Sequence, residues 1–198
     1  RGRGTMTVLN INGITKNFGS LVANDNISLN LDAGEVLALL GENGAGKTTL
    51  MNILFGHYVA DQGGIEIFGN PLPAGAPEAA IEAGVGMVHQ HFTLAENLSV
   101  LENIILGTEP LMAWKSDTAA ARAKLDALAE KYGMKIEPDK LVVDLSIGER
   151  QRVEILKVLY RDAKILILDE PTAVLTPQEV DHLFETLRVM VSGGLSII

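Results

Sequence analysis

Eight residues in the first quarter of the chain constrain its fold more than any other segment. Gly41-Glu42-Asn43-Gly44-Ala45-Gly46-Lys47-Thr48 follow an apolar run at 36–40 and open a segment, Lys47–Phe55, with the composition of a helix that Gly56 ends. Glycines between a strand and a helix let backbone N–H groups turn toward phosphate oxygens, and a helix N-terminus favours an anion. The sequence therefore predicts a phosphate-binding loop in an α/β domain.

Two side chains of this loop have predicted roles in nucleotide chemistry. Lys47 is expected to reach the β- and γ-phosphates, and Thr48 to hold Mg²⁺. The competing interpretation is a Gly-rich turn with an exposed lysine, which the position between a strand and a helix disfavours. The other predicted nucleotide contacts are Gly41, Asn43, Gly44, Gly46 and Thr49.

A second element, far along the chain, ends in two acids. Four apolar residues, Ile165–Leu168, precede Asp169 and Glu170. Ligands bind at the carboxyl ends of strands in α/β sheets, so Asp169 is expected to hold Mg²⁺ and Glu170 to orient and polarise a water molecule. Alone, the pattern fits a simple turn equally well; beside a phosphate-binding loop it predicts hydrolysis.

Other segments outline the architecture. Strands are expected at 8–14, 27–31, 65–68 and Val85–Val88, and at 36–40 as a strand buried on both faces. Helical signals dominate 100–160, most strongly at 117–132, which suggests an inserted helical subdomain. Thr176, Pro177 and Glu179 form a capping box that opens another helix, and Gly193-Gly194 ends it before a strand at 195–198.

A third motif carries a family resemblance. Leu145-Ser146-Ile147-Gly148-Glu149 resembles the signature motif of ABC ATPases, and the phosphate-binding loop, Gln90 and Asp169-Glu170 occur in that family's order. The resemblance covers nearly all of the chain from about residue 8. It implies an α/β P-loop NTPase core of ABC type, with an antiparallel β subdomain and an inserted helical subdomain.

The resemblance also implies how the site works. In ABC ATPases two domains pack head to tail around two ATP molecules, so Ser146 and the Gly148 N–H are expected to cap the ATP held by the other domain. Ser146 also reads as an ordinary helix N-cap, and the two roles are compatible. Gln90 is expected to be a Mg²⁺ and water ligand, with catalysis shared by Lys47, Gln90 and Glu170.

One phenylalanine and two histidines lie near these motifs in the sequence. Phe18 aligns with the aromatic that stacks on adenine in the family, although a lone phenylalanine is more often a core residue. His89 and His91 flank Gln90 without a clustered third ligand, so no zinc site is expected.

The chain departs from the family pattern in several places. Ile147 and Glu149 replace a glycine and a glutamine of the signature, and Thr176 stands where an aspartate is usual. The family's switch histidine is absent, and His182 does not substitute for it. We therefore expect a domain at 6–198 that is truncated at its C-terminus, with a helical subdomain at about 91–160. We also expect the chain alone to hydrolyse ATP very slowly or not at all. Residues 1–5 suggest a tag remnant; a native disordered terminus is the alternative.

Two short segments resemble one branch of this family. Residues 87–92 and 171–176 resemble importers of nucleosides and simple sugars, which carry two ATPase domains in one polypeptide, and the chain resembles the N-terminal one. This implies transmembrane permease subunits and a second nucleotide-binding domain as partners, at the cytoplasmic face of the cell membrane. Phe92, Leu94 and Leu98 are expected either to meet the permease or to pack in their own subdomain, with equal weight.

Composition excludes several other classes. A net charge of −9 with no basic run argues against a nucleic-acid partner, and the absence of cysteine excludes disulfides. No apolar stretch reaches the roughly 18–20 residues that span a bilayer. The rival functions are a soluble ABC ATPase in DNA repair or translation, a non-hydrolysing ATP-binding module, and a P-loop kinase for small molecules, which would have no use for the signature motif.

Overall fold

The computed structural model describes residues 6–42, 44–106 and 118–198, which form two compact units. The first unit takes the chain up to Met87, together with Lys164–Asp169 and Val191–Ile198. The second takes Val88–Ala163 and Glu170–Met190. The predicted helical subdomain, about 91–160, lies inside the second unit, which also takes in most of the last helix.

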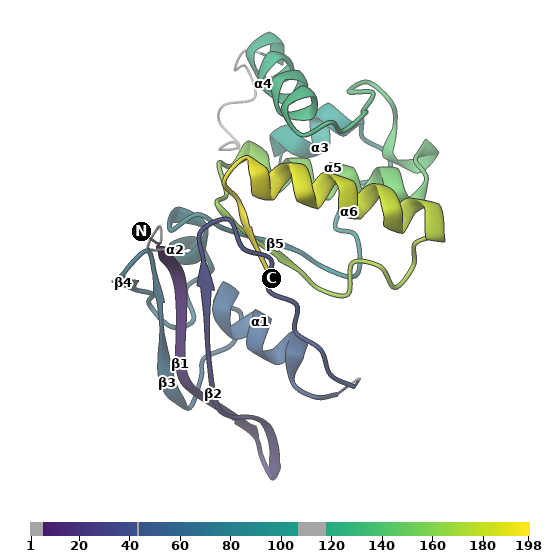
Figure 1. Cartoon of the computed structure of the whole chain (residues 1–198). Helices are drawn as coiled ribbons and strands as arrows, with labels where there is room; N and C mark the ends of the chain where they lie inside the picture. The colour runs from purple at the N-terminus through teal and green to yellow at the C-terminus, as the bar shows by residue number, and fades with distance from the viewer. Residues whose placement is uncertain (1–5, 43, 107–117) are drawn as a thin grey trace. The chain divides into compact units, whose positions relative to one another are not determined.

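The first unit contains a four-stranded antiparallel sheet (Figure 1). Its strands are β1 (Thr7–Phe18), β2 (Leu21–Asp32), β3 (Gln62–Ile67) and β4 (Asn70–Pro71), in the order β2-β1-β3-β4. Leu9 of β1 lies opposite both Leu31 and Ile67. All three side chains are buried, so alternation along the strands supplies one apolar face.

A smaller sheet completes the first unit. Its strands are β5 (Val85–Val88), β6 (Ile165–Leu168) and β7 (Ser196–Ile197), in the order β5-β6-β7, with β6 and β7 parallel. The unit also holds α1 (Lys47–Phe55) and α2 (Pro77–Glu82). The predicted bounds of α1, β5 and β6 are confirmed. Gly56 ends α1 in the left-handed conformation, where a glycine carries no Cβ penalty.

The prediction of a strand at 36–40 is wrong. Val36 makes an isolated bridge to Ile197, and the backbone bonds there are made by Glu35 and Leu37. β7 alongside is only two residues long, so no ladder continues past Leu37 in the described residues. Leu37 and Leu39 pack on the core while Leu40 is 93% exposed, so the segment is buried on one side rather than two.

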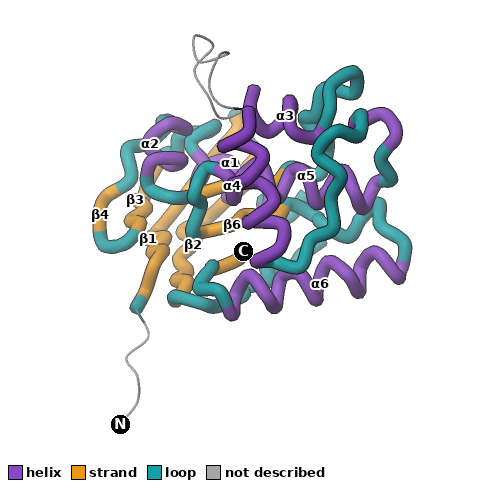
Figure 2. The backbone as a smooth tube through the Cα atoms, turned by 90° about the horizontal axis from the view of Figure 1, so that it is seen from above, coloured by secondary structure: helices purple, strands orange, loops and turns teal. Residues whose placement is uncertain are grey.

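The second unit is helical (Figure 2). It contains α3 (Val100–Leu106), α4 (Thr118–Lys131), α5 (Ile147–Tyr160) and a 3₁₀ turn at Val142–Asp144, and most of α6 (Pro177–Ser192). Helices α3, α4 and α5 pack on one another, and each contributes a fully buried side chain: Ile104, Leu125 and Leu156. The helix predicted at 117–132 corresponds to α4, and its first residue lies outside the described part of the chain.

The capping box predicted for α6 is confirmed. Glu179 N donates to Thr176 Oγ1, and Thr176 N donates to Glu179 Oε2 at 2.9 Å. These bonds satisfy backbone donors that the first turn of a helix leaves unpaired.

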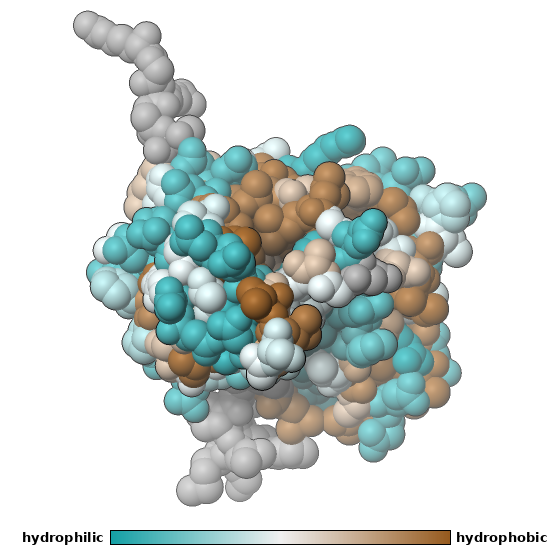
Figure 3. Space-filling view, turned by 90° about the horizontal axis from the view of Figure 1, so that it is seen from below, coloured by the Kyte–Doolittle hydropathy of each residue, from teal (hydrophilic) through white to brown (hydrophobic). Residues whose placement is uncertain are grey.

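The surface mixes hydrophobic and hydrophilic side chains, as the face in Figure 3 shows. Exposed apolar residues include Leu21 and Val22 in the first unit and Phe184 in the second. Scattered exposure of this kind is ordinary for a folded chain. Within the described residues, no helix combines the length and apolar character needed to cross a bilayer.

Candidate phosphate-binding site

Helix α1 begins without a side-chain cap. Its N-cap is Gly46, at φ 87°, and no acidic residue lies in the first turn. A glycine adopts this left-handed conformation without strain, and its lack of a side chain leaves the first N–H groups of the helix open. These groups and the helix dipole make the start of α1 a place that favours an anion.

Strand β2 holds this end of the loop in place. A Cβ added at Gly46 would lie 2.0 Å from Ala23 O, so only glycine fits there. The Asn24 side chain, 5% exposed, donates from Nδ2 to Gly46 O at 3.1 Å. The sequence analysis missed Asn24 because a single asparagine in a strand carries no motif; its Oδ1 has no partner among the described residues.

Lys47 lies back over the loop that precedes it. Its ammonium donates to Gly41 O and, at 3.0 Å, to Glu42 O. The lysine thus joins the start of the loop to the start of α1. Among the other predicted nucleotide contacts, Gly44 adopts a φ of 86° and Thr49 is half-buried. Asn43 lies outside the described residues.

Thr48 and Asp169 meet although 121 residues separate them. Thr48 Oγ1 donates to Asp169 Oδ1 at 3.3 Å. Asp169 directly follows β6, so the parallel sheet delivers its carboxylate to the start of α1. A hydroxyl and a carboxylate side by side are the oxygen donors that Mg²⁺ prefers, and these residues therefore fit the ion.

Glu170 follows in an unusual backbone conformation. Its φ is 45°, and its carbonyl accepts from Ala173 N at 3.2 Å. A non-glycine residue in the left-handed region costs about 1–3 kcal/mol and concentrates at functional sites. The side chain is exposed, which suits a group that must meet water.

Phe18 stands at the end of the β1–β2 hairpin. It is 44% exposed, so the alternative that it is a core residue is wrong. Tyr58 contacts its ring edge-on at 5.6 Å, and Lys16 Nζ lies 5.2 Å from the ring centroid. Asp61 fixes this end by accepting from Asn17 N at 2.7 Å, a bond that also lowers the pKa of Asp61. Stacking of Phe18 on adenine stays a prediction.

In the second unit, the segment after Gln90 is tied to the helices. Gln90 is half-buried. Thr93 donates to Glu154 Oε1 from its N–H at 2.6 Å and from its hydroxyl at 3.0 Å. Ala95 N donates to Asn103 Oδ1 at 2.7 Å. Glu154 and Asn103 are each 5% exposed, and no local pattern marks them, so the sequence analysis did not find them.

Helix α5 begins, in contrast to α1, with a complete cap. Glu149 N donates to Ser146 Oγ, and Ser146 N donates to Glu149 Oε2 at 2.7 Å. The predicted N-cap role of Ser146 is confirmed. The bond from Ser146, with Lys140 and Arg152 nearby, holds the pKa of Glu149 below its usual value.

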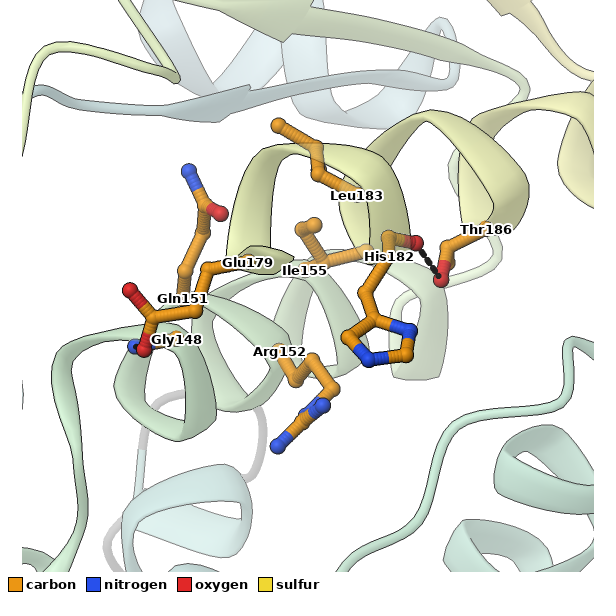
Figure 4. Close-up of a pocket in the computed structure, with 8 residues that line it drawn as sticks. All are labelled: Gly148, Gln151, Arg152, Ile155, Glu179, His182, Leu183 and Thr186. Atoms are coloured by element: carbon orange, nitrogen blue, oxygen red, sulfur yellow. Dashed lines mark hydrogen bonds between the residues drawn. The ribbon is translucent and has the colours of Figure 1, made fainter. Parts of the chain in front are cut away.

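A second carboxylate reaches the start of α5 from α6. Gly148 N donates to Glu179 Oε1 at 3.3 Å, and Figure 4 shows the two residues facing each other beside Gln151 and Arg152. Hydrogen bonds to Thr176 and Gly148 and the charge of Arg152 lower the pKa of Glu179; the bond from the Thr176 N–H is the largest cause. His182 lies on α6 in the second unit and is exposed. Its Nδ1 lies 3.7 Å from Oε2 of Glu185.

The predicted site residues are therefore divided between the two units. The first unit brings together Lys47, Thr48 and Asp169. The second carries Gln90, Glu170, Ser146 and Gly148. Their chemical roles remain predictions.

The chain is similar to known proteins over most of its length. The family model described as ABC transporter matches residues 24–173. The nucleoside import ATP-binding protein NupA of Lactococcus lactis subsp. cremoris (strain MG1363) is 50% identical over 192 residues, which cover 97% of the chain and 38% of that protein. The guanosine import ATP-binding protein NupO of Bacillus subtilis (strain 168) is 48% identical over 191 residues, covering 96% of the chain and 38% of that protein. The chain thus spans well under half the length of these relatives.

Solved structures resemble the fold closely. A nucleotide-free ATP-binding cassette of an ABC transporter superposes with a TM-score of 0.86 at 25% identity, over 97% of the chain and 80% of that structure. The ADP conformation of such a cassette gives a TM-score of 0.86 at 25% identity, over 98% and 80%. The predicted fold class is confirmed.

Proposed function

Because the chain belongs to the ABC transporter family, we propose that it binds and hydrolyses ATP as a nucleotide-binding domain of a membrane importer. The observation that carries the proposal is the contact between Thr48 and Asp169 beside the uncapped start of α1. It places oxygen donors for Mg²⁺ next to N–H groups and an ammonium suited to phosphates.

The proposed mechanism assigns each step to residues of this chain. The open N–H groups of the loop and Lys47 bind the β- and γ-phosphates, and Lys47 exchanges its bonds to Gly41 and Glu42 for phosphate oxygens. Thr48 and Asp169 would hold Mg²⁺, which would offset negative charge on those phosphates. Glu170 orients the attacking water and accepts its proton.

The remaining groups belong to the paired state of two domains. Ser146 and Gly148 would meet the γ-phosphate of an ATP held by a second nucleotide-binding domain. Gln90 would contact Mg²⁺ and water, and Phe18 the adenine. Catalysis is thus shared by Lys47, Gln90 and Glu170, and it requires the second domain, whether a tandem copy or a second chain.

The proposed cargo is a nucleoside or a simple sugar. The supporting observations are the names of the relatives NupA and NupO, together with a ribose import ATP-binding protein of Caldanaerobacter subterraneus that is 43% identical over 192 residues. Uptake of radiolabelled guanosine and ribose by cells with and without the full-length protein tests this assignment. Uptake of neither solute would contradict it.

The proposed partner is a pair of transmembrane permease subunits, which would place the chain at the cytoplasmic face of the cell membrane. Phe92, Leu94 and Leu98 are half-buried in a segment tied down by Glu154 and Asn103, so a partially open apolar surface is available for contact. The chain has no cysteine, so Leu94→Cys gives a single attachment point for crosslinking to the permease.

The matched control for crosslinking is Ala119→Cys, on the exposed side of α4. We expect a permease adduct from position 94 and none from position 119 in an assembled, active transporter. No adduct from position 94 would favour packing of these residues within their own unit.

ATP binding is tested by calorimetry with Mg-ATP. Lys47→Ala removes a charged donor to phosphate, so we expect affinity to fall about 10- to 100-fold. Lys164→Ala removes an exposed lysine of the same unit outside the loop and should leave affinity unchanged. Equal affinity in wild type and Lys47→Ala would contradict the proposed role of the loop.

A further inference from the structure

The carboxylate of Glu179 is shared between two helix starts. Its Oε2 accepts from Thr176 N at 2.9 Å and from Thr176 Oγ1 at 3.1 Å, which caps α6. Its Oε1 accepts from Gly148 N at 3.3 Å, at the start of α5. One side chain therefore joins the start of α6 to the signature segment (Figure 4).

The fit at this contact is close. A Cβ added at Gly148 would lie 2.8 Å from Glu179 Oε1 and 3.1 Å from its Cγ and Cδ. Gly148 is not in the left-handed region, so its backbone does not require glycine. The approach of Glu179 explains the glycine, and the bonds to Thr176 hold Oε2 of the carboxylate while Oε1 faces Gly148.

The proposed function gives the same N–H group another partner. In a paired state, Gly148 N–H would donate to the γ-phosphate of the ATP held by the second domain. A single N–H forms one strong hydrogen bond at a time, and a carboxylate beside a phosphate repels it. Glu179 and the phosphate therefore exclude each other at this position.

We propose that Glu179 is a competitor for the phosphate position of the signature segment, which it occupies until the ATP of a second domain displaces it. The inference rests on the proposed function, because it requires that two domains close on ATP. Displacement releases Oε1 while Oε2 keeps the cap of α6, so α6 stays folded and only its tie to Gly148 opens.

This role also connects two parts of the proposed site. Residues 170–176 join Glu170 to the first turn of α6, where Glu179 lies. Closure on ATP would break the tie between Glu179 and Gly148, while the bond from Gln151 Nε2 to Pro171 O, at 2.7 Å, would still hold this segment to α5. Glu179 is a positioning residue in this scheme and touches no reacting atom.

Charge and contact are separable by substitution. Glu179→Gln keeps the length and the capping ability of the side chain but removes its charge, since glutamine also serves at this position of a capping box. Glu179→Asp keeps the charge but is one methylene shorter, which withdraws the carboxylate from Gly148. Glu185→Gln is the matched control, because Glu185 lies on the same helix, is 71% exposed and has its Oε2 3.7 Å from Nδ1 of His182.

The test measures ATP-driven dimerisation of the 198-residue chain in a Glu170→Gln background, which keeps ATP unhydrolysed. Sedimentation velocity at increasing Mg-ATP gives the half-saturating concentration. We expect Glu179→Gln and Glu179→Asp each to lower it about two- to fivefold, the size of an anion's interaction with an exposed helix end, and Glu185→Gln to leave it unchanged. Thermal unfolding of each variant shows whether the fold is kept.

The outcomes separate the two proposals. Dimerisation without a shift in either Glu179 variant would overturn the competitor role and leave the proposed function standing. An equal shift in Glu185→Gln would also overturn it, because bulk charge would then be the cause. ATP binding without any dimerisation would overturn the pairing of domains, and the competitor role with it.

Discussion

Helices α1 and α5 are both expected to meet phosphate at their first turns, yet they begin in opposite ways. Helix α1 starts at Gly46 with no side-chain cap and no acidic residue. Helix α5 starts at Ser146 with a full capping box, and a second carboxylate from Glu179 covers its next N–H. The first start is open to an anion, and the second already holds two.

The difference follows from what each helix start must do in the proposed function. In the proposed function the loop before α1 binds ATP in a single domain, and the first turn of α1 has no side-chain cap. The signature meets phosphate only when a second domain arrives. Carboxylates of the same chain satisfy its donors until then, which avoids leaving backbone N–H groups without partners.

The largest expected effect is on turnover. Glu170→Gln removes the proposed general base but none of the groups at the start of α1. We expect hydrolysis in the full-length protein to fall about 10²–10⁴-fold, or roughly 3–5.5 kcal/mol of barrier, with ATP binding kept. Steady-state phosphate release and calorimetry measure the two quantities. Near-normal hydrolysis would move the catalytic role to another residue.

The next effect compares alanine at the two glycines. Gly46→Ala places a methyl group against the backbone oxygen of Ala23 and in a left-handed conformation, so we expect a loss of about 2–5 kcal/mol in the free energy of unfolding. The atoms nearest to a methyl group at position 148 belong to the side chain of Glu179 rather than to backbone, so Gly148→Ala should cost less.

Adding Glu179→Ala to Gly148→Ala should recover part of that cost, because the clash is removed. Chemical denaturation of the single and double variants measures this. Equal losses at the two glycines, or no recovery in the double variant, would contradict the contrast between a backbone and a side-chain contact.

Part of the fold could be predicted from local signals in the sequence. The bounds of α1, β5 and β6 followed from local signals: Gly56 ends α1, and four apolar residues form each strand. The prediction of a strand at 36–40 was wrong because pairing there depends on a strand about 160 residues away that is only two residues long. An apolar run does not reveal the length of its neighbour.

The candidate site likewise contains residues that the sequence predicted and residues that it did not. The residues of the phosphate-binding loop and Asp169 were recognisable as contiguous motifs, and Thr48 and Asp169, each predicted to hold Mg²⁺, lie in contact. Asn24 and Glu179 were not recognised as part of the site. Their contacts to Gly46 and Gly148 span 22 and 31 residues. The capping box at Thr176 predicts the local role of Glu179 but not its contact with Gly148.

A smaller effect is expected from the cap of α5. Ser146→Ala removes the acceptor for the Glu149 N–H and should lower stability by about 1 kcal/mol. Thr176→Ala makes the same change at the start of α6 and is the matched comparison. Thermal unfolding of both variants measures the loss. No loss at Ser146 would mean that Glu179 alone suffices to cap α5.

The smallest effect concerns pH. The pKa values of Glu149 and Glu179 are lowered in the folded chain. A lowered pKa means that their contribution to stability is complete above the ordinary glutamate value of about 4.3 and is lost as pH falls through the folded pKa. Between pH 6 and 3, the unfolding temperature of the variant carrying Glu149→Gln and Glu179→Gln should fall less steeply than that of wild type. Parallel curves would show that these carboxylates do not stabilise the helix starts.

The bridge between Val36 and Ile197 has a consequence for how the protein is made. The second unit consists mainly of Val88–Ala163, and its helices pack through contacts close in sequence, so it can fold while synthesis continues. The first unit cannot close its small sheet until β7, at the very end of the 198 residues, has left the ribosome. Strands β1–β4 pair with one another and are all made by residue 71, whereas Val36 and β5 must wait for β6 and β7. Chaperone binding during that interval should therefore concentrate on Val36 and β5.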